Sequence, residues 1–283
     1  MDAELSRPSA NAKRSVFVQS LDRGLAVMRA FSAERPRLTL TEVAREAGIT
    51  RAAARRFLLT LVDLGYVASN GREFSLRPRV LELGYAYLSS MTLPEIAQPH
   101  LEALVEKVAE SSSIAVLDGD HVVDIMRVRG PGILVVAVPV GTRFPVHASS
   151  KGRVLLANLP PGELNRRLAS MRFDRLTSRT VVNKARFREI LAEVREQGYA
   201  LADQELEDGL RSIAVPIRDA AGSAIAGANI SAYASRVTVE DMIGRILPNL
   251  RAAVDEIEAD LRALGLRQSA TPRPSAVPAA TPA

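Results

Sequence analysis

Apolar and polar residues follow first a helix-like and then a strand-like pattern between residues 39 and 76. After Thr50, apolar side chains recur three or four positions apart, at Ala54, Phe57, Leu58, Leu61 and Leu64. After Gly65 the spacing becomes that of short strands, interrupted by Asn70-Gly71, which is the strongest short-range hairpin signal. This pattern predicts a helix followed by a two-stranded hairpin.

Capping residues mark the helix ends in this segment. Thr39 and Glu42 have the spacing of a capping box, in which a threonine oxygen and a glutamate three residues later satisfy amides at a helix start. Gly48 supplies a left-handed residue to end this helix, and Thr50 caps the next one. Two helices joined through a glycine and followed by a hairpin predict a winged helix-turn-helix.

The face of the second helix that we expect to be exposed is basic. Arg51 lies in its first turn, Arg55 and Arg56 lie opposite the apolar positions, and Ala52 is small enough to let the helix start enter a groove. Arginine can fork onto a guanine edge or hold phosphate, and recognition helices present their N-terminal residues to bases. The alternative is a solvated helix face. We expect double-stranded DNA to be contacted by Thr50, Arg51, Ala52, Arg55, Arg56, Thr60 and Arg72.

The distribution of charge agrees with DNA binding. Residues 1–79 hold 14 basic and 8 acidic side chains, whereas the remainder of the chain holds 23 basic and 24 acidic ones. The net charge of +5 therefore comes from the segment that is expected to bind DNA, as contact with phosphate requires.

Beyond the hairpin, helices alternate with β-hairpins, which predicts an α+β fold without a nucleotide-binding βαβ unit. Helices are expected at residues 20–32, 80–91, 94–110, 148–159, 162–170, 184–197 and 239–264. In the first of them Ser20 is the expected cap, and Leu21, Leu25, Met28 and Phe31 have the spacing of a face that closes the core; Asn183 is expected to cap the helix at 184–197. A hairpin is expected at residues 113–128, and further strands at residues 134–140, 199–202, 212–217 and 224–232. We divide the chain into a disordered arm (1–15), a winged helix-turn-helix domain (16–78), a linker or dimerisation helix (79–93), a second domain (94–265) and a disordered tail (266–283).

Composition narrows the class of protein. The chain of 283 residues has no cysteine, which excludes disulfides, Cys-ligated zinc, iron–sulfur clusters and thiol catalysis. Its N-terminus lacks the apolar core of a signal peptide, and its longest apolar run is far shorter than a membrane span. We therefore expect a cytoplasmic protein without a membrane partner.

The second domain offers one candidate ligand site, at the helix that starts at Ser149. Free amides at a helix start, the helix dipole and nearby hydroxyls favour a carboxylate. The alternative is an ordinary N-cap, with Gly152 serving only packing. Polar residues of a later strand and its neighbours could line the same pocket or face solvent. The candidate residues are His147, Ser149, Ser150, Lys151, Gly152, Asp203, Ser212, Asn229 and Ser231.

Catalytic chemistry has little support in the sequence. The histidines His100, His121 and His147 lack the spacing of metal ligands, and Asp120-His121-x-x-Asp124 is typical of an exposed hairpin. A nucleophilic serine at a helix cap would need a base within hydrogen-bond reach, and none is evident. We expect no catalytic residue, no metal and no cofactor; an enzyme that uses the pocket of the second domain is the alternative from another class.

These motifs together resemble the IclR family of bacterial transcriptional regulators over residues 17–264. The resemblance is carried by FVQSLDRGLAVMRAF, the winged unit, PVHASSKGRVLLANL, GYALADQELEDGLRSIAVPI and GANIS. In sequence, these segments are most similar to the branch of the family that controls the β-ketoadipate pathway and responds to protocatechuate, 4-hydroxybenzoate or β-ketoadipate. One departure is Asn229, where some members carry serine.

The resemblance implies a GAF-like effector domain, and it implies an effector pocket at Ser150, Lys151, Asp203, Ser212, Asn229 and Ser231. It also implies partners: operator DNA, a small carboxylate such as an aromatic acid or β-ketoadipate, and further copies of the chain in a dimer or tetramer. RNA polymerase is a further candidate partner. The alternative within the family is a regulator that senses a non-aromatic metabolite such as a 2-oxo acid.

Overall fold

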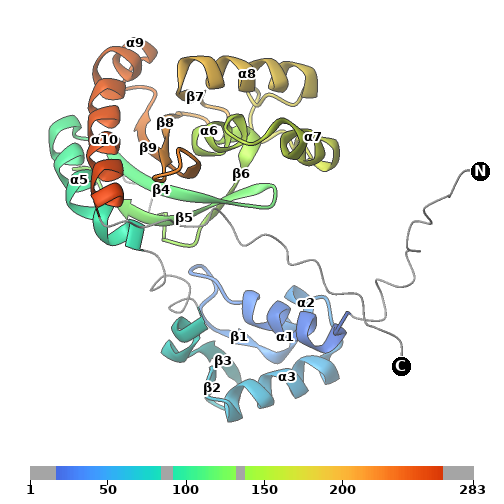
Figure 1. Ribbon diagram of the computed structural model, residues 1–283. Helices are drawn as coiled ribbons and strands as arrows, with labels where there is room; N and C mark the ends of the chain where they lie inside the picture. Colours follow the sequence, from blue (N-terminus) through green and yellow to red (C-terminus); the bar gives the residue numbers. More distant parts are fainter. Residues whose placement is uncertain (1–16, 84–91, 132–137, 264–283) are drawn as a thin grey trace, which may run out of the picture. The chain divides into compact units, whose positions relative to one another are not determined.

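The computed structural model describes residues 17–83, 92–131 and 138–263 (Figure 1). The chain divides into two compact units, Met1–Ser90 and Met91–Ala283. The arm at 1–15 and the tail at 266–283 lie outside the described residues, as does most of the expected linker helix and of the strand expected at 134–140. The finer domain boundaries therefore stay predictions.

The N-terminal unit contains the expected helices and hairpin. Its elements are α1 (Gln19–Arg29), β1 (Leu38–Thr39), α2 (Leu40–Glu46), α3 (Arg51–Asp63), β2 (Val67–Ser69), β3 (Glu73–Leu76) and the 3₁₀ turn η1 (Pro78–Val80). The capping box of Thr39 and Glu42 is confirmed, because each side chain accepts a backbone hydrogen bond from the other residue. Thr50 accepts a bond from the amide of Ala53, and Gly48 is left-handed with φ +63°.

The wing is a three-stranded sheet rather than a simple hairpin. The strand β3 pairs antiparallel with β2 across the Asn70-Gly71 turn, as expected. On its other edge β3 pairs with β1, where Leu38 lies opposite Phe74. The sequence did not indicate β1, because a pair of residues is too short to show an alternating pattern. This pairing ties the start of α2 to the wing.

The orientation of α1 differs from the prediction. The helix follows Val18 without a side-chain cap, so Ser20 is not its cap. Leu21 and Leu25, which we expected in the core, are 63% and 45% exposed, whereas Val27 is fully buried. Gly24 faces Phe57 of α3, since a Cβ built there would lie at an ordinary contact distance of 3.7 Å from the ring. Close packing through Gly24 and Val27 therefore turns the leucines outward.

The C-terminal unit is built on one antiparallel sheet in the order β6-β5-β4-β9-β8-β7. Its strands are β4 (Ser111–Asp118), β5 (His121–Val128), β6 (Arg143–Pro145), β7 (Ala200–Asp203), β8 (Leu210–Arg218) and β9 (Ala224–Tyr233). Its helices and turns are α5 (Thr92–Val108), η2 (Val146–Ala148), α6 (Ser150–Ala157), α7 (Pro161–Ser170), α8 (Lys184–Gln197), α9 (Val239–Asp241), η3 (Met242–Ile246) and α10 (Leu247–Ala263). The predicted α+β class is confirmed.

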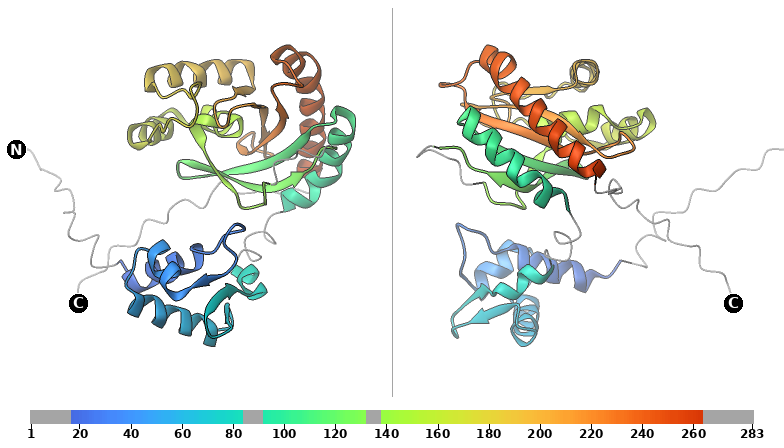
Figure 2. Two further views of the ribbon diagram at one scale, coloured as in Figure 1. Left: turned by 180° about the vertical axis from the view of Figure 1, so that it is seen from behind. Right: turned by 60° about the vertical axis from the view of Figure 1, so that its left-hand side comes forward.

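Helices cover both faces of this sheet. The helices α5 and α10 lie side by side on one face (Figure 2), where they enclose a core with Ile114, Ile213 and Ile230. The helices α6 and α8 cover the other face and enclose a second core, which includes Ala115 and Val122. Successive residues of a strand point to opposite faces, so each strand serves both cores.

The closing helix contains a wide turn that the sequence pattern did not predict. The segment Met242–Ile246 is π-helical, between α9 and α10. Pro248 follows it, and a proline lacks an amide and clashes with the carbonyl four residues earlier, here that of Gly244. The wider turn accommodates this clash, so the expected single helix is interrupted. Along the part of the chain that the structure describes, every helix is too short or too polar to cross a membrane.

Candidate DNA and effector sites

The first candidate site is the exposed face of α3. Ala54 and Leu58 are fully buried against the rest of the N-terminal unit, whereas Arg51, Arg55 and Arg56 are exposed. Thr50 caps the helix, and its first turn holds no acidic side chain. The amides and the three arginines therefore present positive charge at one end of the helix. Leu64, expected in the apolar stripe, is 52% exposed because the helix ends there.

Arg72 and Thr60 complete the predicted DNA-contact set. Arg72 is exposed at the tip of the wing, where Asn70 Oδ1 accepts hydrogen bonds from its amide and that of Glu73. Thr60 is exposed and donates its hydroxyl to the Arg56 carbonyl at 2.9 Å, which leaves only its acceptor lone pairs for another partner. Within the described residues, neither Arg72 nor the arginines of α3 pair with a carboxylate, so their charge is not neutralised locally.

The second candidate site is the start of α6, which lies against the sheet. Ser149 is its N-cap and accepts a hydrogen bond from the Gly152 amide at 3.4 Å. Ser150 and Ser212 of β8 share a hydrogen bond of 2.9 Å between their hydroxyls. Gly227 of β9 permits this approach, because a Cβ there would lie 3.3 Å from the Lys151 carbonyl oxygen. Four of the predicted effector residues, Ser149, Ser150, Gly152 and Ser212, are thus brought to one place.

A buried polar chain joins Lys151 to the strands beneath it. Lys151 Nζ forms an ion pair with Asp124 of β5 and donates to Ser113 Oγ of β4 at 2.6 Å. Ser113 donates to Asn229 Oδ1 at 2.8 Å, and Asn229 Nδ2 donates to Ser231 Oγ at 2.9 Å. Asn229 and Ser231 of β9 therefore lie on the face toward α6. Of the two predicted orientations, toward the pocket or toward solvent, the structure shows the first.

Burial sets the electrostatics of this chain. Lys151 and Asp124 are 3% and 1% exposed. Burial lowers the pKa of Lys151, because the charged ammonium loses its water, and the Asp124 carboxylate opposes that effect. The lysine is therefore held by its carboxylate partner and not by solvent. We call Lys151, Asp124, Ser113, Asn229 and Ser231 the polar chain.

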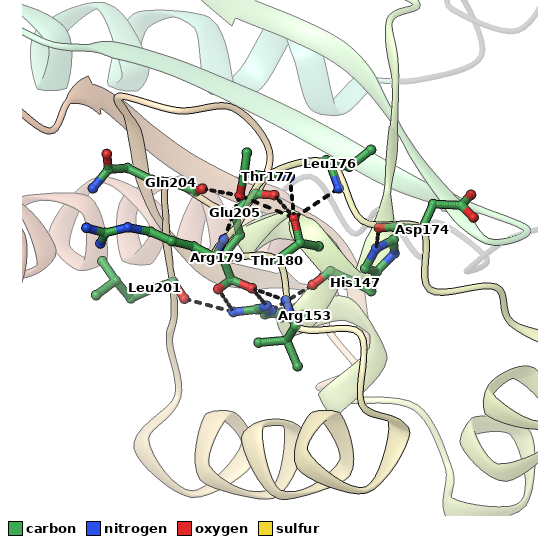
Figure 3. A network of polar contacts seen from close by, with 11 residues as sticks. His147, Arg153, Asp174, Leu176, Thr177, Arg179, Thr180, Leu201, Gln204 and Glu205 are labelled. Carbon is green, nitrogen blue, oxygen red and sulfur yellow. Dashed lines mark hydrogen bonds and ion pairs between the residues drawn. The ribbon is translucent and has the colours of Figure 1, made fainter.

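His147 is directed elsewhere (Figure 3). Its Nε2 donates to the Asp174 carbonyl at 3.0 Å, and its ring lies 5.4 Å from that of Phe173. Burial lowers the pKa of His147, so the ring favours its neutral form. The structure thus places this predicted effector residue against the segment that precedes α8, and its ring takes part in that packing.

Asp203 and Gly152 also have structural partners of their own. Asp203 lies opposite Arg211 in the β7–β8 register, whereas Ser212 lies opposite Ala202, so alternation puts Asp203 and Ser212 on different faces. Asp203 accepts hydrogen bonds from Arg211 at 2.7 Å and Arg179 at 3.0 Å. A Cβ at Gly152 would lie 2.4 Å from Val146, so this glycine serves packing. The structure does not bring Asp203 to the polar chain.

Known proteins are similar to this chain over most of its length. The model of the IclR helix-turn-helix domain matches residues 20–71, and that of the bacterial transcriptional regulator IclR C-terminal region matches residues 85–259. The chain belongs to the IclR family. It is therefore a DNA-binding transcriptional regulator with an effector domain.

Relatives of this IclR-family chain include regulators of aromatic catabolism. The Pca regulon regulatory protein of Pseudomonas putida is 43% identical over 238 residues, which are 84% of this chain and 82% of that protein. The p-hydroxybenzoate hydroxylase transcriptional activator of Acinetobacter baylyi is 37% identical over 85% of this chain and 91% of its own. The crystal structure of an IclR homolog complexed with 4-hydroxybenzoate, from Microbacterium hydrocarbonoxydans, has a TM-score of 0.75 at 28% identity and covers 87% of this chain and 100% of its own.

The sequence analysis missed Asp124 and Ser113 in this IclR-family domain. The interpretation of Asp120–Asp124 as an exposed hairpin is wrong at Asp124, which is buried beneath α6. Its position inside the apolar run of β5 was a usable signal, because a charged residue in a buried strand requires a partner. No signal in the sequence connected it to Lys151. Among the described residues, no group of three or more potential ligands could hold a metal ion.

Proposed function

We propose that this IclR-family protein controls genes of aromatic-acid breakdown, specifically of the β-ketoadipate pathway, and that a small aromatic carboxylate modulates its binding to operator DNA. The pathway rests on the similarity to the Pca regulon regulatory protein, at 43% identity. The homologue that is complexed with 4-hydroxybenzoate supports the class of effector. The single observation that carries DNA binding is the exposed arginine face at the start of α3.

DNA recognition would proceed through α3 and the wing. Arg51, Arg55 and Arg56 are free to reach guanine edges or phosphates in the major groove, and Ala52 lets the helix start approach the base pairs. Arg72, at the tip of the wing, would contact the backbone or minor groove beside it. Thr50 would hold the helix start in shape and, with the hydroxyl of Thr60, would add polar contacts.

Replacement of Arg55 and Arg56 by alanine should abolish specific operator binding. A well-formed arginine–base contact contributes about 1–3 kcal/mol, so the double variant should bind at least about 30-fold more weakly. The measurement is fluorescence anisotropy with the DNA upstream of the regulated genes. Arg186→Ala/Arg188→Ala in α8 is the control, since it removes the same charge from the other unit. Equal affinity of the two double variants would contradict the assignment.

The effector would occupy the start of α6 above the polar chain. The free amides of Ser150 and Lys151 and the helix dipole suit a carboxylate, and Ser150, Ser212 and Ser231 add hydroxyl groups on the same side. His147, Ser149 and Gly152 would act by holding this turn in shape. A ligand shifts a conformational equilibrium only through unequal affinity for its states, so it would act by favouring one arrangement of paired recognition helices.

Thermal unfolding with a panel of acids tests the class of effector. The panel contains protocatechuate, 4-hydroxybenzoate, β-ketoadipate, pyruvate and glyoxylate. A ligand at 100 times its dissociation constant stabilises the folded state by about 2.7 kcal/mol, which gives a visible shift of the midpoint. We expect a shift with an aromatic-pathway acid. A shift with pyruvate or glyoxylate alone would instead identify a regulator that senses 2-oxo acids.

Self-association would pair two recognition helices on one operator. The outward face of α1 carries Leu21 and Leu25 at a four-residue spacing, and Phe17 lies just before the helix; all three are at least 45% exposed. An exposed apolar stripe of this kind is typical of an interaction surface. A symmetric dimer formed there would match a two-fold DNA site.

A further inference from the structure

The two oxygens of the buried Asp124 carboxylate differ in their partners. Oδ1 takes part in the ion pair with Lys151, whereas Oδ2 is buried and accepts no hydrogen bond from any described residue. A buried acceptor without a donor costs about 1–3 kcal/mol, and more when it is charged. Such atoms are rare in native proteins unless a bound group supplies the donor. Asp124 Oδ2 is therefore a position where a donor is missing.

The positive charge of Lys151 is already balanced by the carboxylate of Asp124. Its ammonium has three donors, of which Asp124 and Ser113 take two, and the group lies 5.7 Å from the centre of the Phe144 ring. A carboxylate placed at this point would meet the negative charge of Asp124 at close range. Asp124 Oδ2 itself therefore favours a hydrogen-bond donor over an anion. Arg127, opposite Ser113 in the β4–β5 register, interacts electrostatically with both Asp124 and Lys151 and adds positive charge beside them.

Hydroxyl groups that can donate hydrogen bonds lie on the same face of the sheet, beneath α6. Hydrogen bonds run in one direction from Lys151 through Ser113 and Asn229 to Ser231, whose hydroxyl proton is not donated to any residue that the structure describes. In the Ser150–Ser212 pair, one hydroxyl donates to the other and the second keeps its proton. These hydroxyls and the amides at the start of α6 can bind a carboxylate, while Asp124 Oδ2 accepts.

We propose that Asp124 is the specificity-determining residue for a hydroxyl group on the aromatic effector, whose proton it accepts in a hydrogen bond at Oδ2. The inference rests on the proposed effector class. Lys151 belongs to the first turn of α6, and its ammonium forms the ion pair with Asp124. The acceptor therefore lies within one lysine length of the helix start, which is similar to the span of a benzene ring with its substituents.

The first experiment compares ligands on the full-length wild-type protein by titration calorimetry. The ligands are benzoate, 3- and 4-hydroxybenzoate, and the methyl ether of each hydroxy acid. Each ether keeps the oxygen but lacks the proton. A hydrogen bond to a charged group contributes enough for a preference of about 10- to 100-fold, so one hydroxybenzoate should bind that much more tightly than benzoate and its own ether.

The outcomes separate the inference from the proposal on which it rests. Similar affinities for benzoate and both hydroxybenzoates would overturn the role of Asp124 and leave the aromatic effector intact. Binding of none of these acids would overturn both. The ultraviolet spectrum of the bound hydroxy acid provides a second measurement: a phenol that donates to Asp124 stays protonated, whereas a phenolate band would show that Lys151 binds the ring oxygen instead.

Variants then test the residue itself. Removal of Asp124 alone would leave a buried lysine charge, so the test variant is Asp124→Leu/Lys151→Met, which removes both charges and the acceptor oxygens. The control is Asp118→Leu/Arg143→Met, which removes an exposed ion pair between β4 and β6 of the same sheet. The test variant should lose the hydroxyl preference to within about threefold while still binding benzoate, and the control should keep it. A test variant that kept the wild-type ratio would overturn the inference, and if it failed to fold, the wild-type comparison and spectrum would still decide.

Discussion

At the scale of single residues, Gly152 shows how a glycine in a predicted ligand site can serve packing. The turn before α6 brings the backbone of Val146 so close that a Cβ on residue 152 would lie 2.4 Å from both its Cα and its carbonyl oxygen. Backbone atoms cannot swing aside as a side-chain end can. The glycine therefore fixes where α6 starts, and through Ser150 and Lys151 it fixes the polar chain.

Substitution of Gly152 by alanine should destabilise the C-terminal unit. Overpacking of a well-packed region typically costs about 1–3 kcal/mol, and the midpoint of urea unfolding measures it. Gly162→Ala in α7 is the matched control, because nothing lies within 4 Å of the added Cβ. Alanine lowers the conformational entropy of the unfolded chain, so this variant should be stabilised by about 0.4–1 kcal/mol. Equal midpoints for the two variants would show that the turn can relax.

Local chemistry made some residues predictable and left others hidden. The caps at Thr39, Thr50 and Asn183 act on amides two or three positions away, so a short window of sequence identifies them. Asp124 is paired with Lys151, which lies 27 positions later in the chain. Only the folded sheet brings these two side chains together, and no spacing rule could connect them.

At the scale of elements, α6 is held by a second buried ion pair, on the side away from the polar chain. Arg153 binds both oxygens of Glu205 at 2.7 and 2.6 Å and donates to the His147 and Leu201 carbonyls (Figure 3). Glu205 also accepts from the Val181 amide at 3.1 Å. The pair thus joins α6, the end of β7 and the segment before α8.

Removal of one partner from this pair should be costly. Glu205→Ala leaves the Arg153 charge buried and should destabilise the C-terminal unit by about 3–5 kcal/mol. Arg153→Met/Glu205→Leu replaces both charges with apolar groups and should recover part of that loss. Arg186→Ala in α8 breaks an exposed pair and should change stability by about 1 kcal/mol or less. Urea unfolding of all three variants checks the order; a double variant as unstable as the single one would contradict it.

The sequence predicted which helices and strands form, but it predicted less well which face of a helix is buried. The hydrophobic period placed α3, α8 and the strands β8 and β9 within a few residues of their observed bounds. It gave the wrong inward face for α1, because Leu21 and Leu25 have the correct spacing for a core but face outward. Periodicity shows that a helix has an apolar stripe and cannot show what covers it.

At the scale of the molecule, each unit encloses its own buried residues. Val27, Leu58 and Val67 belong to the N-terminal core, and no residue of that core belongs to the cores of the C-terminal unit. DNA contact and effector contact are thus expected from separately stabilised parts. Within the N-terminal unit, the outward stripe of α1 is the surface that could bring two chains together.

Charges introduced into that stripe should separate the chains without unfolding them. Leu21→Glu/Leu25→Glu places carboxylates where we expect a dimer contact, and both side chains are exposed in the single chain. Sedimentation velocity should show a smaller species, and affinity for a two-fold operator should fall with it. Arg23→Ala, on the same helix, is the control for helix integrity. An unchanged oligomer would place the interface elsewhere.

The Lys151–Asp124 pair also restricts how the domain can change by mutation. Loss of either partner alone leaves a buried charge, at a cost of about 3–5 kcal/mol, which is a large part of the 5–15 kcal/mol that typically separates a folded domain from its unfolded chain. Variants in which only one of these two residues is replaced would be selected against, regardless of the effector that they bind. Ser113 and Ser231, which carry no charge, can vary one at a time. Divergence in effector choice is therefore expected to begin at the serines, with Lys151 and Asp124 exchanged only together.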